Sequence, residues 1–426
     1  MTKKATMAET AIAILRANDR GGYTVPTAGL YPFQWNWDSA FCAMGFATFD
    51  EPRAWRELET LFSGQWEDGL VPHIIFHAPT DSYFPGPEVW GTPTGKGRPR
   101  TSGITQPPVA AIAARAIWER ADNKELAEAK MRALYPKLLA SHRWWRRARD
   151  PEGSGLVALL HNWESGMDNS PVWDAALDRT PRTKTPYQRK DTGHVDASMR
   201  PRAIDYDRYV HLIETYREAG WDPAKIWAAA PLKIAHIGVN AILLRAEIDL
   251  LALAKNFGSP DDQKEISDRI SVKTAAIAKL WSPTISAYQS FDLIVNMPID
   301  APTSAGFLPL ITDVPTADQT KAMVAEMRRW RALSQVGMPT VAPDDPRFEG
   351  KRYWRGPVWP IVNWLLIDGL IRHGEQGLAA DLARDTLNLF EIKGFDEYFD
   401  PVDQTPCGGS NFSWSAATAL WLIRAA

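Results

Sequence analysis

The chain has 426 residues, enough to bury a large core, and 23% of them are charged, with a formal net charge of −3. This near balance gives no reason to expect a nucleic acid or an anionic membrane as partner. No run of about 18 apolar residues is present, so we expect no membrane span, and the small number of cysteines (Cys42 and Cys407) favours a reducing cytoplasm.

Helical patterning dominates the chain. Apolar residues recur at spacings of three and four positions, which predicts about twelve helices, at 5–18, 38–48, 52–64, 106–121, 124–149, 206–219, 233–256, 259–281, 317–332, 357–373, 376–391 and 411–425. The alternating patterns of β-strands are almost absent. We therefore predict an all-α fold, a single domain over 1–426 in which six helical hairpins close into a ring. A solenoid would need a repeat of fixed length, which the sequence lacks.

Two long segments without helical patterning interrupt this succession of helices, at 65–105 and 150–205. The first is rich in Pro and Gly, and the second carries the stretch NWESGMDNSPVWD before a polar, basic part. Long irregular segments inside a domain are usually functional or disordered. Their aromatic residues argue against disorder, so we expect both to form walls of a pocket at one end of the ring.

Tryptophan is abundant, with 19 residues, and much of it gathers with acidic and amide residues in four short segments. They are YPFQWNWDSAF (31–41), NWESGMDNSPVWD (162–174), YWRGPVWPIVNW (353–364) and GFDEYFDP (394–401). A sugar stacks its C–H faces on indole rings, while its hydroxyls need polar partners. The clusters therefore favour a carbohydrate site over simple packing of Trp at the corners of hairpins.

Hydrolysis of a glycosidic bond needs a proton donor and a carboxylate that activates water or attacks carbon. Asp168 lies in a turn bracketed by Gly166 and Pro171, with Trp163 nearby to desolvate it and raise its pKa. Glu164 is a rival for this role. On the other side, Glu397 lies between aromatic residues in FDEYFDP.

These segments resemble glycoside hydrolase family 63, and within it the small bacterial mannosylglycerate and glucosylglycerate hydrolases. The stretches that carry the resemblance, in chain order, are YPFQWNWDSAF, SYFPGPEVWG, SGITQPP, NWESGMDNSPVWD, RPRAIDYDRY, YWRGPVWP and EYFDP followed by FSWSA. The resemblance implies an (α/α)6 toroid and an inverting α-glycosidase without a cofactor or metal, acting on a small sugar substrate.

The resemblance also implies roles for individual residues. Asp168 would be the general acid and Glu397 the general base. The residues implied to hold the cleaved sugar are Trp35, Trp37, Asp38, Trp163, Gly166, Tyr353, Trp354 and Trp359, and those on the glycerate side are Tyr31, Tyr83, Gln106, Arg200 and Tyr206. A substrate carboxylate would need forked cationic donors, which either Arg200 or Arg202 could supply.

Two positions depart from the family pattern. Gln34 stands where the resemblance predicts a small hydroxyl residue, and Phe412 stands where some glucosylglycerate hydrolases carry glutamine. The preference for gluco or manno substrates and the oligomeric state, including a homo-oligomer, stay open at this point.

Other functions fit the sequence less well. A trehalase-like or oligosaccharide α-glucosidase would use the same ring but would need no cation for the aglycone. A sugar epimerase or isomerase would need histidines among the Trp clusters, where only His161 lies at an edge. A carbohydrate-binding protein would need no paired carboxylates. His73 and His77 are four residues apart, as zinc ligands can be, but no HExxH motif is present.

Overall fold

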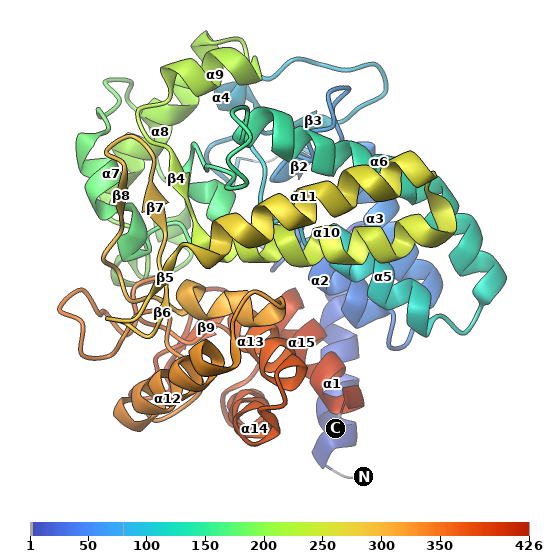
Figure 1. Cartoon of the computed structure of the whole chain (residues 1–426), viewed down its shortest axis with the longest axis vertical. Helices are drawn as coiled ribbons and strands as arrows, with labels where there is room; N and C mark the ends of the chain where they lie inside the picture. Colours follow the sequence, from blue (N-terminus) through green and yellow to red (C-terminus); the bar gives the residue numbers. More distant parts are fainter. Residues whose placement is uncertain (1–2, 80, 426) are drawn as a thin grey trace.

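The computed structural model describes residues 3–79 and 81–425, and its core is a ring of helices (Figure 1). Six helices form the inner layer, each in contact with the next around a closed circle: α2 (Asn36–Phe46), α5 (Ala110–Arg120), α10 (Ile237–Phe257), η5 (Ser304–Ile311), α13 (Pro360–Arg372) and α15 (Ser413–Ala425). Contacts between α15 and α2 close the circle. The fold is the predicted (α/α)6 toroid.

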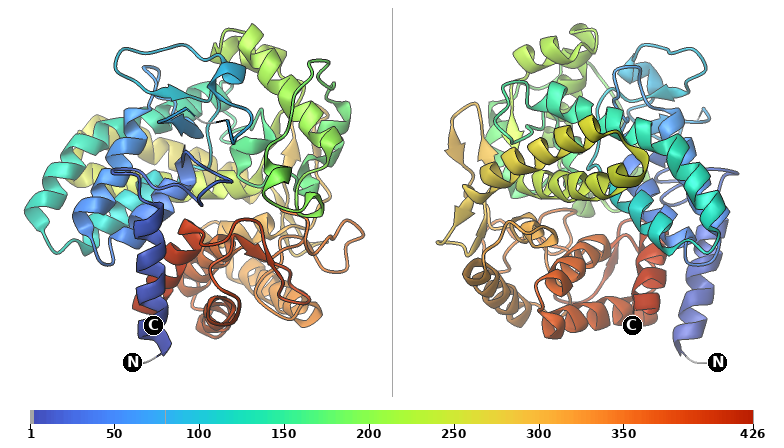
Figure 2. Two further views of the ribbon diagram at one scale, coloured as in Figure 1. Left: turned by 180° about the vertical axis from the view of Figure 1, so that it is seen from behind. Right: turned by 45° about the vertical axis from the view of Figure 1, so that its right-hand side comes forward.

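Outer helices alternate with the inner ones along the chain: α1 (Lys3–Asn18), α3 (Glu51–Ser63), α6 (Lys124–Arg149), α11 (Pro260–Ala278), α12 (Ala317–Leu333) and α14 (Gln376–Lys393). Figures 1 and 2 show α11 lying along α10, and α1 beside α15 near the two termini. Burial follows position: every residue of α2 is buried, whereas outer α3 buries only one face.

Local sequence accounts for several helix starts. The side chains of Asp50 and Asn123 accept hydrogen bonds from backbone N–H groups in the first turns of α3 and α6. Ser259 and Thr316 begin capping boxes that start α11 and α12. These side chains satisfy backbone donors that have no partner within the helix.

The predicted twelve segments are all helical, but one of them lies outside the ring. The segment predicted at 206–219 is α8 (Ala203–Glu218), which contacts α4 (Pro87–Trp90) and α9 (Pro223–Ala229). Its place in the ring is taken by the 3₁₀ helix η5, whose eight residues are all buried and which includes Pro309. Trp330 of α12 packs on Phe307 of η5, with ring centroids 5.0 Å apart.

The two predicted insertions are folded. The first contains α4 and two strands, and β2 (Ile74–Phe76) pairs with both β1 (Gln34–Trp35) and β3 (Arg100–Thr101), Ile75 lying opposite Gln34 and Thr101. The second contains the short helices η1 (Asn162–Ser165), η2 (Pro171–Trp173), α7 (Asp174–Arg179), η3 (Asp191–Gly193) and η4 (Ala197–Met199).

The remaining strands are short and form one three-stranded sheet, in the order β4-β7-β8, and two two-stranded sheets, β5-β6 and β9-β10. Their bounds are β4 (Ile234–Ala235), β5 (Trp281–Ser282), β6 (Ala287–Tyr288), β7 (Phe291–Asp292), β8 (Met297–Pro298), β9 (Tyr398–Phe399) and β10 (Pro406–Cys407). Among the described helices, none combines the length and the apolar character needed to cross a bilayer.

The alternation of layers decides where a site can form. Each inner helix except the last, α15, is followed by an outer helix that runs back, so the inner helices run in one direction. The loops that precede them therefore meet at one end of the ring, next to the two insertions.

Candidate active site

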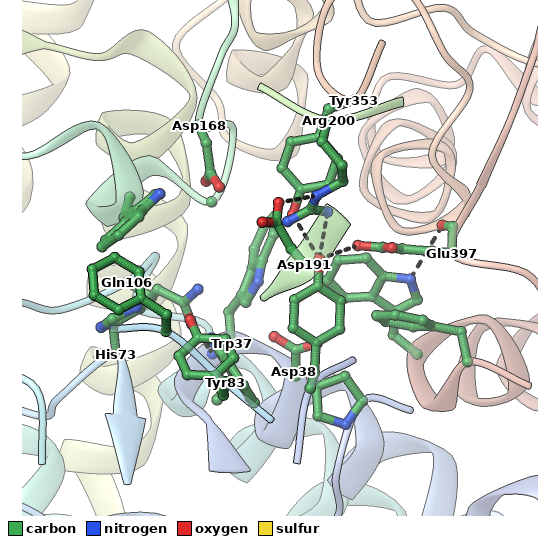
Figure 3. Close-up of a pocket in the computed structure, with 18 of the residues that line it drawn as sticks. Trp37, Asp38, His73, Tyr83, Gln106, Asp168, Asp191, Arg200, Tyr353 and Glu397 are labelled. Carbon is green, nitrogen blue, oxygen red and sulfur yellow. Dashed lines mark hydrogen bonds and ion pairs between the residues drawn. The ribbon is translucent and has the colours of Figure 1, made fainter. Parts of the chain in front are cut away.

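A cavity opens at this end of the ring (Figure 3). The structure brings together in its lining all the sequence-predicted residues except Trp354 and Trp359. The predicted residues that line it are Tyr31, Trp35, Trp37, Asp38, Tyr83, Gln106, Trp163, Gly166, Asp168, Arg200, Tyr206, Tyr353 and Glu397. In Figure 3 the carboxyl groups of Asp168 and Glu397 enter the cavity from different sides.

Asp168 is presented by a tightly held turn. Asn162 Nδ2 donates a hydrogen bond of 2.9 Å to the Asp168 carbonyl, and the Trp173 indole donates one of 3.1 Å to the Met167 carbonyl. Gly166 has a φ of +68°, and a Cβ there would lie 2.6 Å from Trp37 Cζ2. Only glycine fits this turn, because both the backbone conformation and the indole exclude a side chain.

The Asp168 carboxyl group is desolvated, and few neighbouring groups stabilise its negative charge. Burial raises its pKa to about 7, while the positive charge of Arg200 acts against this and the negative charge of Glu397 adds to it. Within residues 3–79 and 81–425, no other residue donates a hydrogen bond to this carboxylate. A carboxyl group with a pKa near 7 is protonated in a large fraction of molecules at neutral pH and can then donate its proton.

Glu397 lies across the cavity and is only 1% exposed. Burial raises its pKa to about 7, and Arg200, the Gly409 N–H and the Tyr31 hydroxyl favour the ionised form. The Gly409 N–H donates to Oε2 at 3.0 Å and the Tyr31 hydroxyl to Oε1 at 3.2 Å. Glu397 therefore has two fixed donors that stabilise a carboxylate, unlike Asp168.

Arg200 is the buried cation of the site, 3% exposed. Its Nη1 donates to the Tyr31 hydroxyl at 2.7 Å, its Nε donates to Asp191 at 2.9 Å, and its guanidinium lies 4.2 Å from the centroid of the Tyr353 ring. Nη2 donates to no other described residue. This nitrogen is therefore available to a ligand, while the rest of the guanidinium is fixed.

Polar groups from the N-terminal ends of inner helices complete the cavity. Asp38 lies in the first turn of α2, and burial together with the charge of Glu397 raises its pKa well above the usual range. Gln106, just before α5, accepts a hydrogen bond of 3.3 Å from the Trp37 N–H through Oε1. This contact orients the Gln106 amide, so that its NH₂ group is the part left for a ligand.

The structure also decides between rivals. Glu164 is completely buried and forms an ion pair with Arg149, with Nη2 and Oε1 2.5 Å apart, outside the cavity. Arg202, the rival of Arg200, is exposed and pairs with Glu349 at 2.8 Å. Of these two pairs of candidates, Asp168 and Arg200 line the cavity, and Glu164 and Arg202 do not.

Trp354 and Trp359 do not take the places predicted for them. Their rings stack on each other with centroids 3.7 Å apart, and Trp359 also stacks on Tyr398 at 4.5 Å. Both side chains are buried behind Tyr353 and do not line the cavity. The stack of Trp354, Trp359 and Tyr398 leaves no room for a sugar between its rings, and Trp359 packs edge-on against Tyr353 with ring centroids 5.2 Å apart.

The lining includes six residues that the sequence-based prediction left out: Pro26, His73, Phe84, Asp191, Phe412 and Trp414. His73 Nδ1 is 2.7 Å from Ser102 Oγ, and burial lowers its pKa well below the usual value, so it is neutral. Trp414 and Phe412 stand at the start of α15 in the matched FSWSA stretch, a signal that could have found them. No local pattern marks Asp191, which stands in a polar, basic stretch.

Comparisons with known proteins show which family the chain resembles. A model of the mannosylglycerate hydrolase MGH1-like glycoside hydrolase domain matches residues 31–415. The chain is 48% identical over 426 residues to mannosylglycerate hydrolase MGH1 of Selaginella moellendorffii, covering 99% of this chain and 87% of that protein. It is 35% identical over 434 residues to glucosylglycerate hydrolase of Mycolicibacterium hassiacum, covering 98% of this chain and 97% of that one.

A solved structure is also similar. The crystal structure of the family 63 mannosylglycerate hydrolase from Thermus thermophilus, in complex with Tris and D-glycerate, superposes with a TM-score of 0.94. The two chains are 46% identical, and the match covers 97% of this chain and 99% of that one. Neutral trehalase from Saccharomyces cerevisiae, 17% identical with a TM-score of 0.60, shares the fold alone.

Proposed function

Because the chain belongs to the mannosylglycerate hydrolase MGH1-like group of glycoside hydrolase family 63, we propose that its substrate is a hexose α-linked to D-glycerate. The protein is a glycoside hydrolase. The proposed products are the free hexose and glycerate, formed with inversion at the anomeric carbon.

One observation carries the proposal. One cavity holds two carboxyl groups with pKa values raised to about 7 and the buried guanidinium of Arg200, whose Nη2 has no hydrogen-bond partner among the described residues. The two carboxyl groups suit acid–base hydrolysis of an acetal, and the guanidinium suits the carboxylate of a glycerate aglycone.

In the proposed mechanism the two carboxyl groups act on opposite sides of the anomeric carbon. Protonated Asp168 donates its proton to the glycosidic oxygen as the bond from that oxygen to the anomeric carbon breaks. Ionised Glu397 removes a proton from a water molecule, which forms the new bond to the anomeric carbon. Glycerate leaves with its hydroxyl restored, and the hexose has the opposite anomeric configuration.

Other residues hold the substrate in this proposal. Trp35, Trp37 and Trp163 provide apolar surface for the hexose, and Asp38 provides a polar partner for its hydroxyls. Arg200 would bind the glycerate carboxylate through Nη2, with Tyr206 and the amide of Gln106 beside it. These contacts position the glycosidic oxygen between the two carboxyl groups.

We propose mannose as the preferred hexose. The Selaginella and Thermus relatives, at 48% and 46% identity, are named mannosylglycerate hydrolases, whereas the glucosylglycerate hydrolase is 35% identical. Phe412 packs on Trp414, with ring centroids 4.7 Å apart, and gives the lining an apolar side chain where a glutamine would donate hydrogen bonds.

We also propose a cytoplasmic location, which fits the two cysteines, Cys42 and Cys407, because both are buried free thiols.

The test is to incubate the protein with mannosylglycerate, glucosylglycerate and trehalose and to follow the products by NMR. We expect release of mannose from mannosylglycerate at the highest kcat/KM, with the β-anomer as the first product. Equal cleavage of trehalose would instead support a trehalase-like enzyme. Release of the α-anomer would contradict inversion.

A further inference from the structure

Asp191 joins two guanidinium groups next to the cavity. Arg189 donates to Asp191 through Nη2 to Oδ2 at 2.6 Å and through Nε to Oδ1 at 3.0 Å. Arg200 donates through Nε to the same Oδ2 at 2.9 Å. Two arginines therefore share one carboxylate, and the three side chains form a cluster with a net positive charge, because both arginines hold the pKa of Asp191 at about 2.

The position of Asp191 creates an electrostatic problem for an anionic ligand. Asp191 lines the cavity together with Arg200, whereas Arg189 does not. An anion at Arg200 Nη2 would meet the negative charge of Asp191 as well as the positive charge of Arg200. These two charges alone cancel, and a neutral pair attracts a carboxylate weakly.

We propose that Arg189 determines the preference for an anionic aglycone by neutralising Asp191 from behind. The charge of Arg189 offsets that of Asp191, so that the charge of Arg200 is left uncompensated for the substrate. Asp191 in turn fixes the direction of the Arg200 guanidinium. This inference rests on the proposed function, since it assumes that the aglycone carries a carboxylate.

The contacts of Arg189 show that it acts through the cluster. Its Nη1 donates to the Pro201 carbonyl at 2.7 Å, and its guanidinium lies 3.8 Å from the centroid of the Tyr206 ring. Asp191 and the Pro201 carbonyl therefore hold the edges of the Arg189 guanidinium, and the Tyr206 ring lies against one of its faces. Arg189 is therefore fixed outside the cavity, and its effect on a ligand would come from its charge.

The experiment compares two substrates that differ only in charge: the mannoside of D-glycerate and the same mannoside of glycerol. We expect Arg189→Gln to raise KM for the glycerate substrate about tenfold or more, since a nearby unit charge is lost in a buried site. The kcat for glycerate mannoside and both constants for the glycerol mannoside should change less than about twofold. Arg189→Lys should resemble the wild type, and Arg182→Gln is the control for loss of an arginine from the same insertion.

The double variant separates charge from structure. Arg189→Gln with Asp191→Asn restores the net positive charge of the cluster, so KM for glycerate mannoside should return toward the wild-type value. Asp191→Asn alone keeps an oxygen acceptor for Arg200 and should leave this KM within about threefold of the wild type. A merely structural role predicts that the double variant binds worse than either single variant.

The outcomes also separate this inference from the proposed function. If the wild-type protein does not prefer the glycerate mannoside over the glycerol mannoside, the proposed substrate is wrong and the inference is wrong with it. If the wild type has the preference and Arg189→Gln keeps it, only the inference is overturned. If circular dichroism shows that Arg189→Gln does not fold, the Asp191→Asn variant provides the test. A large rise in its KM for the glycerate mannoside, without a rise for the glycerol mannoside, would contradict the charge argument.

Discussion

Asp168 and Glu397 have similarly raised pKa values but different surroundings. Both pKa values lie at about 7, because both side chains are buried and their carboxyl groups are desolvated. Glu397 accepts hydrogen bonds from Gly409 N–H and the Tyr31 hydroxyl, whereas Asp168 has no donor from another described residue. These donors favour the ionised form of Glu397, so we expect Glu397 to lose its proton more readily than Asp168.

This arrangement predicts that each carboxyl group is needed for turnover. Asp168→Asn and Glu397→Gln should each lower kcat by about a hundredfold or more, because the proton transfers are lost. Their matched controls are Asp174→Asn, in the same segment but paired with Arg355, and Asp396→Asn, next to Glu397. Steady-state kinetics and circular dichroism check the prediction; near-normal activity with either substitution of a cavity carboxyl would remove that residue from its proposed role.

The Tyr31 hydroxyl should set the pH at which Glu397 ionises. In the wild type we expect kcat/KM to fall on both sides of a pH near 7, since one group must be protonated and the other ionised. Tyr31→Phe removes a donor that lowers the pKa of Glu397. A raised pKa of the base means ionisation at higher pH, so the acid limb of the profile should move upward. An unchanged acid limb would show that this hydrogen bond does not act on the base.

Asp168 should also affect stability. Its folded pKa is raised from the ordinary value of 3.8 to about 7, so the folded state binds the proton more tightly than the unfolded state. Stability from this group is therefore present at low pH and is lost as the pH rises from about 4 to about 7. Melting curves at pH 5 and pH 8 should show a smaller loss of Tm for Asp168→Asn than for the wild type. Parallel losses in the two proteins would contradict the raised pKa.

At the scale of elements, the turn before η2 holds Asp168 in place and depends on a glycine. Gly166→Ala should lower kcat at least about tenfold, because the new Cβ would lie 2.6 Å from Trp37 Cζ2 and the φ of +68° disfavours any side chain. Gly193→Ala, in the same insertion, meets no atom within 4 Å and should leave activity unchanged. The measurement is kcat with mannosylglycerate for both variants, and equal activity would show that the turn tolerates a displaced indole.

Elements differ in how well local sequence predicted them. The amphipathic outer helices, α11 and α12 among them, were predicted from the spacing of their apolar residues, because this signal is local. Helix η5 was not, since it is short, apolar on all sides and contains Pro309. Helix α8 has a regular pattern, but that pattern does not tell whether its apolar face packs in the ring or in an insertion.

At the scale of the whole molecule, the ring closes where α2 meets α15. A Cβ on Gly45 would lie 2.6 Å from the Ala417 Cβ and 2.8 Å from its Cα. Gly45→Ala should therefore lower the free energy of unfolding by about 1–3 kcal/mol through overpacking. Gly377→Ala, the same change in α14 with no atom within 4 Å, should stabilise by up to about 1 kcal/mol. Urea unfolding of both variants checks this, and a stabilised Gly45→Ala would mean that the two helices are not in tight contact.

Local sequence was enough to predict the all-helical class and the four Trp-rich segments, whereas the acid–base roles of Asp168 and Glu397 were implied by the resemblance to family 63. It could do so because helical periodicity is local and because aromatic and acidic residues cluster within single loops. The tertiary structure alone placed Asp191 beside Arg200, sent Arg202 to the surface and put Trp354 and Trp359 behind the cavity wall. Those outcomes depend on which loops meet at the end of the ring, and contacts between residues distant in the chain leave no local pattern.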